Sequence, residues 1–453
     1  MPHLIVFSHL RWNFVYQRPQ HLVSRLAKHY PVLFVEEPVH DEGPARIESS
    51  SPCENVQVLR PHTPVDAVGF HDDQLPVLRP LVADHLRENG IDDYIVWFYT
   101  PMALPLLAEL EPRAVVYDCM DELSAFKDAP KQLRQREAAL MKSAQLVLCG
   151  GPSLFEAKKS LHHNVLCLPS AVDAQHYAPQ IATSKIDLML KAEQIQGRIP
   201  GPRLGFFGVI DERLDTDLVA AVADAERDWQ VVMVGPVVKI DPARLPQRRN
   251  IHWLGQQPYP LLPQLVADWD VCLLPFALNE STRFISPTKT LEYMAAEKPI
   301  VSTPVHDVVV MYGDVVRIGA DPASFVESCR WALSETPYKR AERIAESLAT
   351  VSRFSWDNTA RCVHEAIAKV LAATPVSLPL SMPLPPERRV AAAGMPALAA
   401  ATPALAVGMP ALAPAKLAAG APARKLRSVA GASPESERAA AAETASQSAR
   451  AAG

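Results

Sequence analysis

Short apolar runs alternate with helical patterns over the first 170 residues. The runs cover residues 3–7, 32–36, 94–99, 114–118, 145–149 and 165–168, with helical patterns at 19–29, 74–88, 102–110, 131–143 and 152–161. Runs this short that are apolar throughout are typical of parallel strands buried on both faces. The alternation predicts an α/β fold with a doubly wound sheet, and we place this first domain at residues 1–180.

A second series of the same design follows. The polar interval that ends in Pro200, Gly201 and Pro202 predicts a linker at residues 181–201. Apolar runs then resume at 203–209, 230–235, 250–255, 269–276 and 298–303, which predicts a second Rossmann-like domain over residues 202–353. The last helical pattern, at residues 354–372, comes after the second sheet is complete, and we expect this helix to cross back to the first domain.

The chain changes character at residue 373. Residues 373–453 are rich in Ala and Pro, contain no aromatic residue, and repeat the sequence GMPALA at positions 394 and 408. Such a segment buries too little apolar surface to offset the entropy lost on ordering. We predict a disordered C-terminal tail, and the alternative is a tether for a partner.

Composition limits the class of protein. The 453 residues, 48% hydrophobic and 21% charged, are ordinary for a soluble globular protein and too many for one hydrophobic core. The net charge of -5 argues against a nucleic-acid partner. The seven cysteines lack CxxC spacing and residues 1–12 lack the features of a signal peptide, so we predict a cytoplasmic protein without disulfides or zinc. Peripheral contact with the inner membrane face stays open, although no strongly basic amphipathic helix is present.

Polar residues follow several of the predicted strands. Open parallel sheets bind ligands at the carboxyl ends of their strands, so these positions are candidate sites. In the first domain, His9 follows residues 3–7, and Asp118 and Asp121 follow residues 114–117. We select these three as candidate catalytic residues. The alternatives are a structural hydrogen-bonding role for His9 and hydrogen bonds to loop amides for the two aspartates.

A helix start in the second domain carries the most informative pattern. Ser286 followed by Pro287 predicts a capped helix N-terminus, whose free amides and positive dipole end suit a diphosphate. Lys289 adds a charge within the first turn, and Glu292 lies three residues further on the same face, where a carboxylate can accept ribose hydroxyls. The alternative is a solvated ion pair between the two side chains. The position of this helix after a buried strand favours the binding role over the ion pair. Thr288 belongs to the same predicted donor site.

Several segments resemble a known enzyme family. SPTKTLEYMAAEKPIVST (286–303), GFFGVIDERLD (205–215), residues 250–276 and SWDNT (355–359) resemble the C-terminal domain of family 4 retaining glycosyltransferases, also called group 1. QRPQHLVSRLA (17–27) and VYDCMDELSAF (116–126) resemble the N-terminal domain of a bacterial branch of that family. The resemblance covers roughly residues 3–372. It implies GT-B architecture, in which two Rossmann-like domains face a cleft that binds a nucleotide sugar.

The resemblance also assigns roles to individual residues. Glu292 would hold the ribose, while Arg213 and Lys289 would contact the diphosphate. Gly208 would let the backbone approach the sugar or phosphate, and the segment 254–256, which includes Gly255, would contact the nucleobase. Asp118 and Asp121 would lie beside the reacting sugar.

One position departs from the family pattern. Family members commonly carry a glutamate eight positions before the residue that matches Glu292, where this chain has Phe284. The role of that glutamate, contact with the donor sugar, is then empty or passes to Glu280 or to the SPTK loop.

The implied reaction is transfer of a sugar from a nucleoside diphosphate sugar to a glycan, lipid-linked or small-molecule acceptor, with retained anomeric configuration. We expect no metal and no cofactor besides the donor, because no DxD motif follows a strand, and we place the reaction in polysaccharide biosynthesis. The alternative is a catalytically silent GT-B-like scaffold or nucleotide-sugar-binding protein, which the Phe284 departure keeps open. A nicotinamide-dependent oxidoreductase is nearly excluded, because residues 7–20 contain no glycine for a GxGxxG turn.

Overall fold

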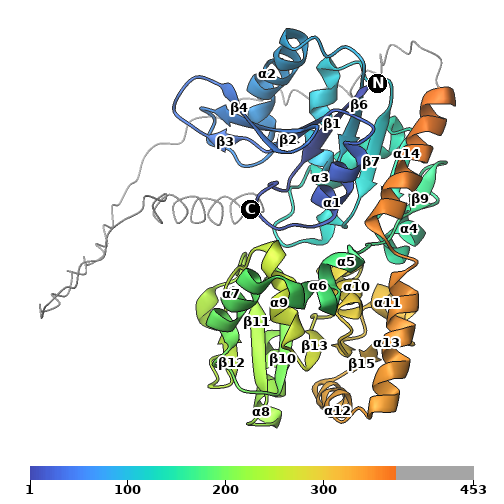
Figure 1. Ribbon diagram of the computed structural model, residues 1–453. Coiled ribbons are helices and arrows are strands. Elements are labelled where there is room, and N and C mark those ends of the chain that lie inside the picture. The colour runs from blue at the N-terminus through green and yellow to red at the C-terminus, as the bar shows by residue number, and fades with distance from the viewer. Residues whose placement is uncertain (374–453) are drawn as a thin grey trace, which may run out of the picture. The chain divides into compact units, whose positions relative to one another are not determined.

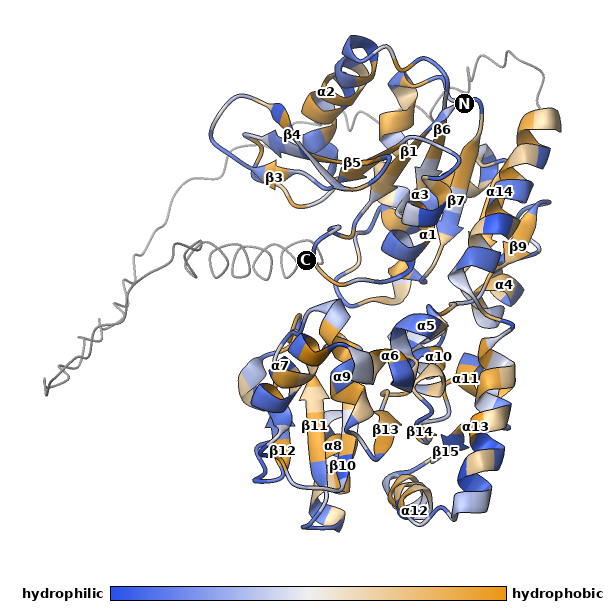
Figure 2. Ribbon diagram, in the orientation of Figure 1, coloured by the Kyte–Doolittle hydropathy of each residue, from blue (hydrophilic) through white to orange (hydrophobic). Residues whose placement is uncertain are grey.

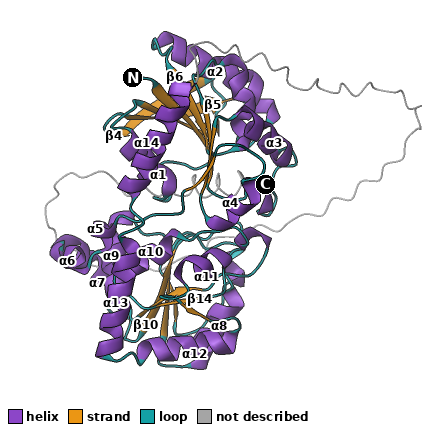
Figure 3. Ribbon diagram, turned by 90° about the vertical axis from the view of Figure 1, so that its right-hand side faces the viewer, coloured by secondary structure: helices purple, strands orange, loops and turns teal. Residues whose placement is uncertain are grey.

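Two sheets, each covered by helices on both faces, form the computed structural model, which describes residues 1–373 (Figures 1 and 3). Both sheets belong to one compact unit. The central strands of each sheet are hydrophobic along their length (Figure 2). The predicted α/β fold with two Rossmann-like domains is confirmed, while the predicted disordered tail at 373–453 lies, apart from its first residue, outside the described residues.

The first sheet is parallel except for one strand. Its order is β3-β5-β2-β1-β6-β7-β8-β9, and β4 pairs antiparallel with β5. The strands are β1 (His3–Ser8), β2 (Val32–Glu36), β3 (Val39–His40), β4 (Arg46–Cys53), β5 (Val56–Thr63), β6 (Tyr94–Phe98), β7 (Val115–Cys119), β8 (Leu146–Cys149) and β9 (Val165–Cys167). Strand β1 lies between β2 and β6, with Ile5 paired with Leu33 and with Val96. The strand order therefore reverses at β1, which places residues 8–11 at the switch point where open sheets bind ligands.

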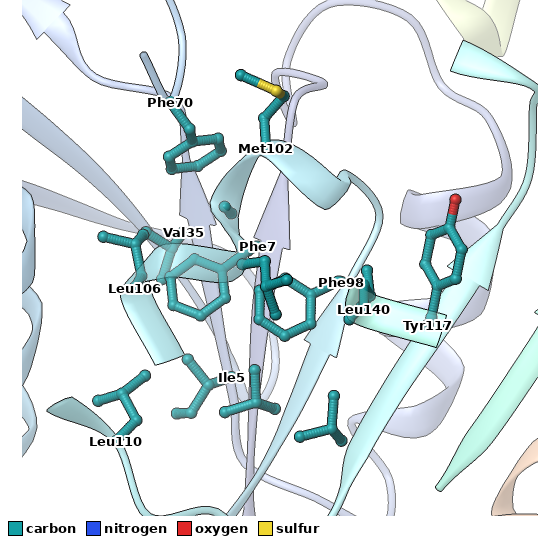
Figure 4. Packing of buried hydrophobic residues seen from close by; sticks show 14 of the residues in the cluster. Ile5, Phe7, Val35, Phe70, Phe98, Met102, Leu106, Leu110, Tyr117 and Leu140 are labelled. Atoms are coloured by element: carbon teal, nitrogen blue, oxygen red, sulfur yellow. The ribbon is translucent and has the colours of Figure 1, made fainter. Parts of the chain in front are cut away.

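Helices cover both faces of the first sheet. They are α1 (Arg18–Leu26), α2 (Leu75–Glu88), α3 (Leu133–Ser143) and α4 (Pro152–Lys158), with 3₁₀ turns η1 (Asp72–Gln74), η2 (Pro101–Glu109) and η3 (Leu123–Ala125). One face packs on α2, α3 and η2, where Phe7 stacks on Phe98 at 5.4 Å between ring centroids (Figure 4). Burial of these apolar side chains stabilises the domain and fixes where the strands end.

The second sheet is parallel throughout, in the order β12-β11-β10-β13-β14-β15. Its strands are β10 (Arg203–Phe207), β11 (Gln230–Val234), β12 (Ile251–Trp253), β13 (Val271–Leu274), β14 (Ile300–Ser302) and β15 (Arg317–Ile318). Its helices are α8 (Thr216–Ala225), α9 (Leu262–Ala267), α10 (Thr288–Ala295), α11 (His306–Tyr312), α12 (Pro322–Leu333) and α13 (Pro337–Val351), with 3₁₀ turns η4 (Pro242–Arg244), η5 (Tyr259–Leu261) and η6 (Glu280–Thr282). The order reverses between β10 and β13, so the loops after these two strands form the expected ligand edge.

The interval expected as a linker is mostly helical. It contains α6 (Pro179–Ser184) and α7 (Ile186–Gln196), preceded by α5 (Ala174–Tyr177). Ala192 and Ile199 are buried in the core of the second domain, and Gln196 Nε2 donates to Leu265 O at 2.9 Å. The polar composition predicts an open connector because its few apolar residues are spaced too widely to show the buried face.

Helix α14 (Trp356–Ala373) packs against the first domain. Val363 and Ile367 are fully buried in the cluster that also contains residues of α1, and Tyr30 Oη lies 2.8 Å from His364 Nδ1. Figure 1 shows α14 alongside the first sheet, after the chain has completed the second. This is the helix expected at residues 354–372.

Three further features complete the description of the fold. The apolar pattern does not predict the β4–β5 hairpin, because its outer strand RIESSSPC is almost wholly exposed and lacks an apolar run. All seven cysteines lie within the described residues and are free. None of the helices within residues 1–373 combines the length and apolar character needed to cross a bilayer.

Candidate functional site

The N-terminus of α10 lies at the predicted position but is not capped as predicted. The helix begins at Thr288, its cap residue is Pro287, and no side chain among residues 1–373 caps it. Ser286 stands one residue too early, and its carbonyl accepts a hydrogen bond from Ser170 Oγ at 2.9 Å, while Thr288 Oγ1 donates to the same Ser170 hydroxyl at 3.4 Å. The predicted Ser286 cap is therefore wrong. The first amides of α10 still lack a side-chain acceptor, which suits an anionic ligand.

Lys289 extends from this helix onto the backbone of Gly208. Gly208 has φ +145°, and a Cβ at this position would lie 2.1 Å from Lys289 Cε. The Lys289 ammonium lies 5.7 Å from the ring centroid of Phe206, and no described residue accepts a hydrogen bond from it. Burial and the neighbouring Arg213 lower the pKa of Lys289. The structure thus brings together Gly208, Arg213 and Lys289. The Lys289 ammonium forms no ion pair with a carboxylate of the described residues.

Arg213 is held in place by the carboxylate two residues before it. Its Nε and Nη2 donate to Asp211 at 3.0 and 2.7 Å, so the pair is bidentate. Within residues 1–373, Nη1 of Arg213 donates to no acceptor. One edge of the guanidinium is therefore oriented by Asp211 and the other is available to a phosphate.

Glu292 is buried one turn into α10. Its side chain belongs to a residue only 6% exposed. Burial raises the pKa of this carboxyl, whereas Lys289 and the nearby Tyr177 act in the opposite direction. A solvated Lys289–Glu292 pair is thus contradicted, because the carboxyl is buried beside the Tyr177 hydroxyl.

The first domain contributes Asp121 and His9. Burial raises the pKa of Asp121 to about 6, and Arg213, Asp211 and Lys289 all lie close enough to act on it. Burial and the charge of Lys239 lower the pKa of His9 to about 4, and its buried Nδ1 has no hydrogen-bond partner among the described residues. Both predicted residues therefore lie beside cations of the second domain, with His9 neutral at pH 7.

Asp118 occupies a different environment from Asp121. Its side chain is fully buried, and both carboxylate oxygens accept from Arg18 Nε, at 3.1 and 3.0 Å. Arg18 also donates to Leu168 O at 2.9 Å. The geometry makes Asp118 the partner of a buried arginine, so its expected place beside a reacting sugar is not supported.

Lys239 belongs to the site but carries no strong signal in the sequence. Lys239, in the loop after β11, has φ +61°, and its ammonium lies 5.1 Å from the ring centroid of Phe126. Arg213 Cζ lies 5.4 Å from the same ring. A left-handed backbone at a lysine costs energy and often marks a functional loop. Only the position of Lys239 after a predicted strand could have identified it.

The remaining predicted positions are less engaged. Gly255 has φ +67° with open space around its Cβ position, and its carbonyl accepts from Gly235 N at 2.8 Å. Phe284 packs against the apolar cluster of the first domain, and the side chain of Glu280 is 80% exposed. Exposure of Glu280 gives no support to its expected role at the donor sugar. No group of three or more His, Cys, Asp or Glu side chains within residues 1–373 is arranged to hold a metal ion.

Comparisons with known proteins agree with this architecture. Residues 201–335 match the family model "Glycosyl transferases group 1". TuaH of Bacillus subtilis (strain 168), which its name assigns to teichuronic acid biosynthesis as a glycosyltransferase, is 25% identical over 294 residues, covering 59% of this chain and 71% of TuaH.

Solved structures share the fold at low sequence identity. Sucrose-phosphate synthase from Thermosynechococcus elongatus superposes with a TM-score of 0.64 at 13% identity, over 82% of this chain and 100% of that one. Anabaena Alr3699/HepE in complex with UDP and glucose gives 0.58 at 16% identity, over 82% and 100%. The family match over the second domain, the TuaH similarity and the shared fold together support a glycosyltransferase of the group 1 kind with the GT-B fold.

Proposed function

We propose that the protein transfers a sugar from a nucleoside diphosphate sugar bound mainly by its second domain. The observation that carries the proposal is the position of Lys289, which extends from the first turn of α10 over the backbone of Gly208, with Arg213 close enough to lower its pKa. Helix amides and two cations together suit a diphosphate, and the glycine allows the ligand to approach the chain closely. The complexes of HepE with UDP and of an E. coli trehalose-6-phosphate protein with UDP-2-fluoro glucose support a donor of this chemical class.

Each residue has a role in this proposal. The ribose hydroxyls meet Glu292, and the segment 254–256 contacts the base. As the bond between the sugar and the diphosphate breaks, the leaving diphosphate takes the electron pair, and Arg213 and Lys289 stabilise the growing negative charge. The acceptor hydroxyl passes its proton to an oxygen of the leaving diphosphate and attacks on the same face of the sugar, so the anomeric configuration is retained. Asp121 and neutral His9 are the first-domain groups that orient the sugar or the acceptor, and no metal takes part.

The proposed acceptor is inferred from the relative TuaH and not from the geometry of the site. The name of TuaH places that protein in the synthesis of a polysaccharide. We infer a glycan or lipid-linked glycan acceptor for this chain, and peripheral contact with the inner face of the membrane would fit a lipid-linked one.

Nucleotide titration tests the donor site. The full-length protein is titrated with UDP, GDP and ADP by calorimetry, followed by the Glu292→Ala and Glu280→Ala variants. We expect one nucleotide to bind in the micromolar range and Glu292→Ala to weaken it by at least about tenfold, a loss typical of a buried hydrogen-bonded group. Glu280→Ala, at an exposed carboxylate, should bind as the wild type. Absence of binding to all three nucleotides, or equal binding by Glu292→Ala, would refute the assignment.

A further inference from the structure

A loop of the first domain reaches the cations of the second. It follows β7, runs from Asp121 through η3, and carries Phe126 at its tip. Its base is fixed because Glu122 accepts from Lys158 Nζ at 2.7 Å, and the same ammonium contacts Glu137 at 2.9 Å. Ser124 Oγ adds a hydrogen bond to Glu122 at 2.7 Å. A fixed base and an aromatic tip place Phe126 reproducibly against the other domain.

The ring of Phe126 contacts two cations that come from different loops. Arg213 lies on the loop after β10 and Lys239 on the loop after β11, at 5.4 and 5.1 Å from the ring centroid. A cation within about 6 Å of a ring is attracted to the electron-rich face. Two like charges that would otherwise repel each other are therefore gathered around one ring.

Packing alone does not explain this position. Phe126 is only half-buried and belongs to none of the hydrophobic clusters in residues 1–373, whereas its neighbour Leu123 packs on the core of the first domain. Its ring lies against the two cations and stacks on no other aromatic ring within residues 1–373. Nε and Nη2 of Arg213 are bound to Asp211, so Nη1 stays available to a ligand while the guanidinium contacts the ring.

We propose that Phe126 is a positioning residue for the donor, whose ring holds Arg213 and Lys239 so that both charges face the diphosphate together with Lys289. The inference rests on the proposed function, and it adds Lys239 as a third cation of the donor site. Because Phe126 belongs to the first domain, the cations take this arrangement only while the two domains are in contact. Donor affinity and domain contact are then linked through one side chain.

Titration of full-length variants with UDP distinguishes the effect of the aromatic ring at position 126 from the effect of side-chain size. Phe126→Leu keeps an apolar side chain but removes the ring, and Phe126→Tyr keeps the ring. We expect Phe126→Leu to weaken UDP binding about fivefold, the size of one to two cation–ring contacts, and Phe126→Tyr to stay within about twofold of the wild type. Trp331→Leu is the control, because it removes another ring beside a guanidinium, that of Arg317, at an exposed site on α12.

A double variant shows whether the effect passes through the cations. In a Lys239→Ala background, Phe126→Leu should weaken UDP binding by less than about twofold, because one of the charges it positions is already gone. Equal losses in both backgrounds, or a Phe126→Tyr variant as weak as Phe126→Leu, would overturn the inference. Wild-type affinity in Phe126→Leu would overturn it as well while leaving the proposed function intact. Failure of the wild type to bind UDP, GDP and ADP would instead remove the proposed function and, with it, this inference.

Discussion

The ion pair between Arg18 and Asp118 allows a structural role for Asp118 to be separated from a catalytic one. Asp118→Ala removes a carboxylate that accepts from Arg18 Nε at 3.1 and 3.0 Å. The arginine side chain, only 4% exposed, then keeps a single acceptor in Leu168 O. Removing one partner of a buried pair costs about 3–5 kcal/mol, because the remaining charge stays out of water without compensation. We expect the free energy of unfolding to fall by that amount.

Urea denaturation at pH 7, followed by circular dichroism, measures this loss. Asp118→Asn should fall between the wild type and Asp118→Ala, since an amide still accepts one hydrogen bond from Arg18. The double variant Arg18→Met with Asp118→Leu should be more stable than Asp118→Ala, because replacing both charges removes the desolvation penalty. UDP binding, measured on the folded fraction, should stay within about threefold in all variants.

The opposite pattern would refute this reasoning. If Asp118→Asn changed the free energy of unfolding by less than about 0.5 kcal/mol, the range of neutral surface changes, and yet abolished sugar transfer, Asp118 would have to act on the substrate. The carboxylate would then have a catalytic role, as the sequence predicts, and the pairing with Arg18 would be incidental.

Two further predictions concern the site itself. Gly208→Ala places a methyl group against Lys289 at a φ of +145°, so we expect UDP affinity to fall at least about tenfold by calorimetry; Gly90→Ala, at φ +64° in open space, controls for the backbone and should bind normally. The pKa of His9 is lowered from 6.5 to about 4, so the folded protein keeps this side chain neutral. As the pH drops from 6.5 towards 4, the unfolded chain takes up the His9 proton first, and the free energy of unfolding falls. Between pH 7 and pH 5 this contribution is about 2 kcal/mol, and His9→Asn should show a correspondingly smaller loss in urea titrations at the two pH values; an equal loss would refute it.

Burial on both faces is what made the fold predictable. Strand β2 has the bounds that the apolar run at 32–36 predicts, and β10 and β11 lie within one or two residues of theirs. Strand β4 was not predicted because it is an exposed edge strand, which pairs only with β5 within residues 1–373. The helices at 179–196 were not predicted because their buried contacts are made by a few small or polar residues, such as Ala192 and Gln196.

Site residues could be predicted only where they belong to a recognisable local sequence pattern. The SPTK sequence marks the start of α10 and therefore Lys289, whereas the ion pair of Asp118 depends on Arg18, which lies 100 residues away along the chain. Lys239 belongs to a strained loop with no periodic pattern. Long-range pairing decides whether a polar residue at a strand end is free for chemistry, and a single sequence does not contain that information.

The contacts between the two domains give the site a property that neither domain has alone. Asp307 of α11 accepts from the amide of Ser153, in the first turn of α4, at 3.0 Å, and on another part of the surface Tyr16 stacks on Tyr259 at 4.6 Å. Neither contact includes a predicted donor-binding residue. Because Asp121 and Phe126 reach the cations only while such contacts persist, any change that weakens them also lowers the population that binds the donor well. Donor affinity in this enzyme is therefore expected to respond to residues far from the diphosphate, with the contact surface setting the response.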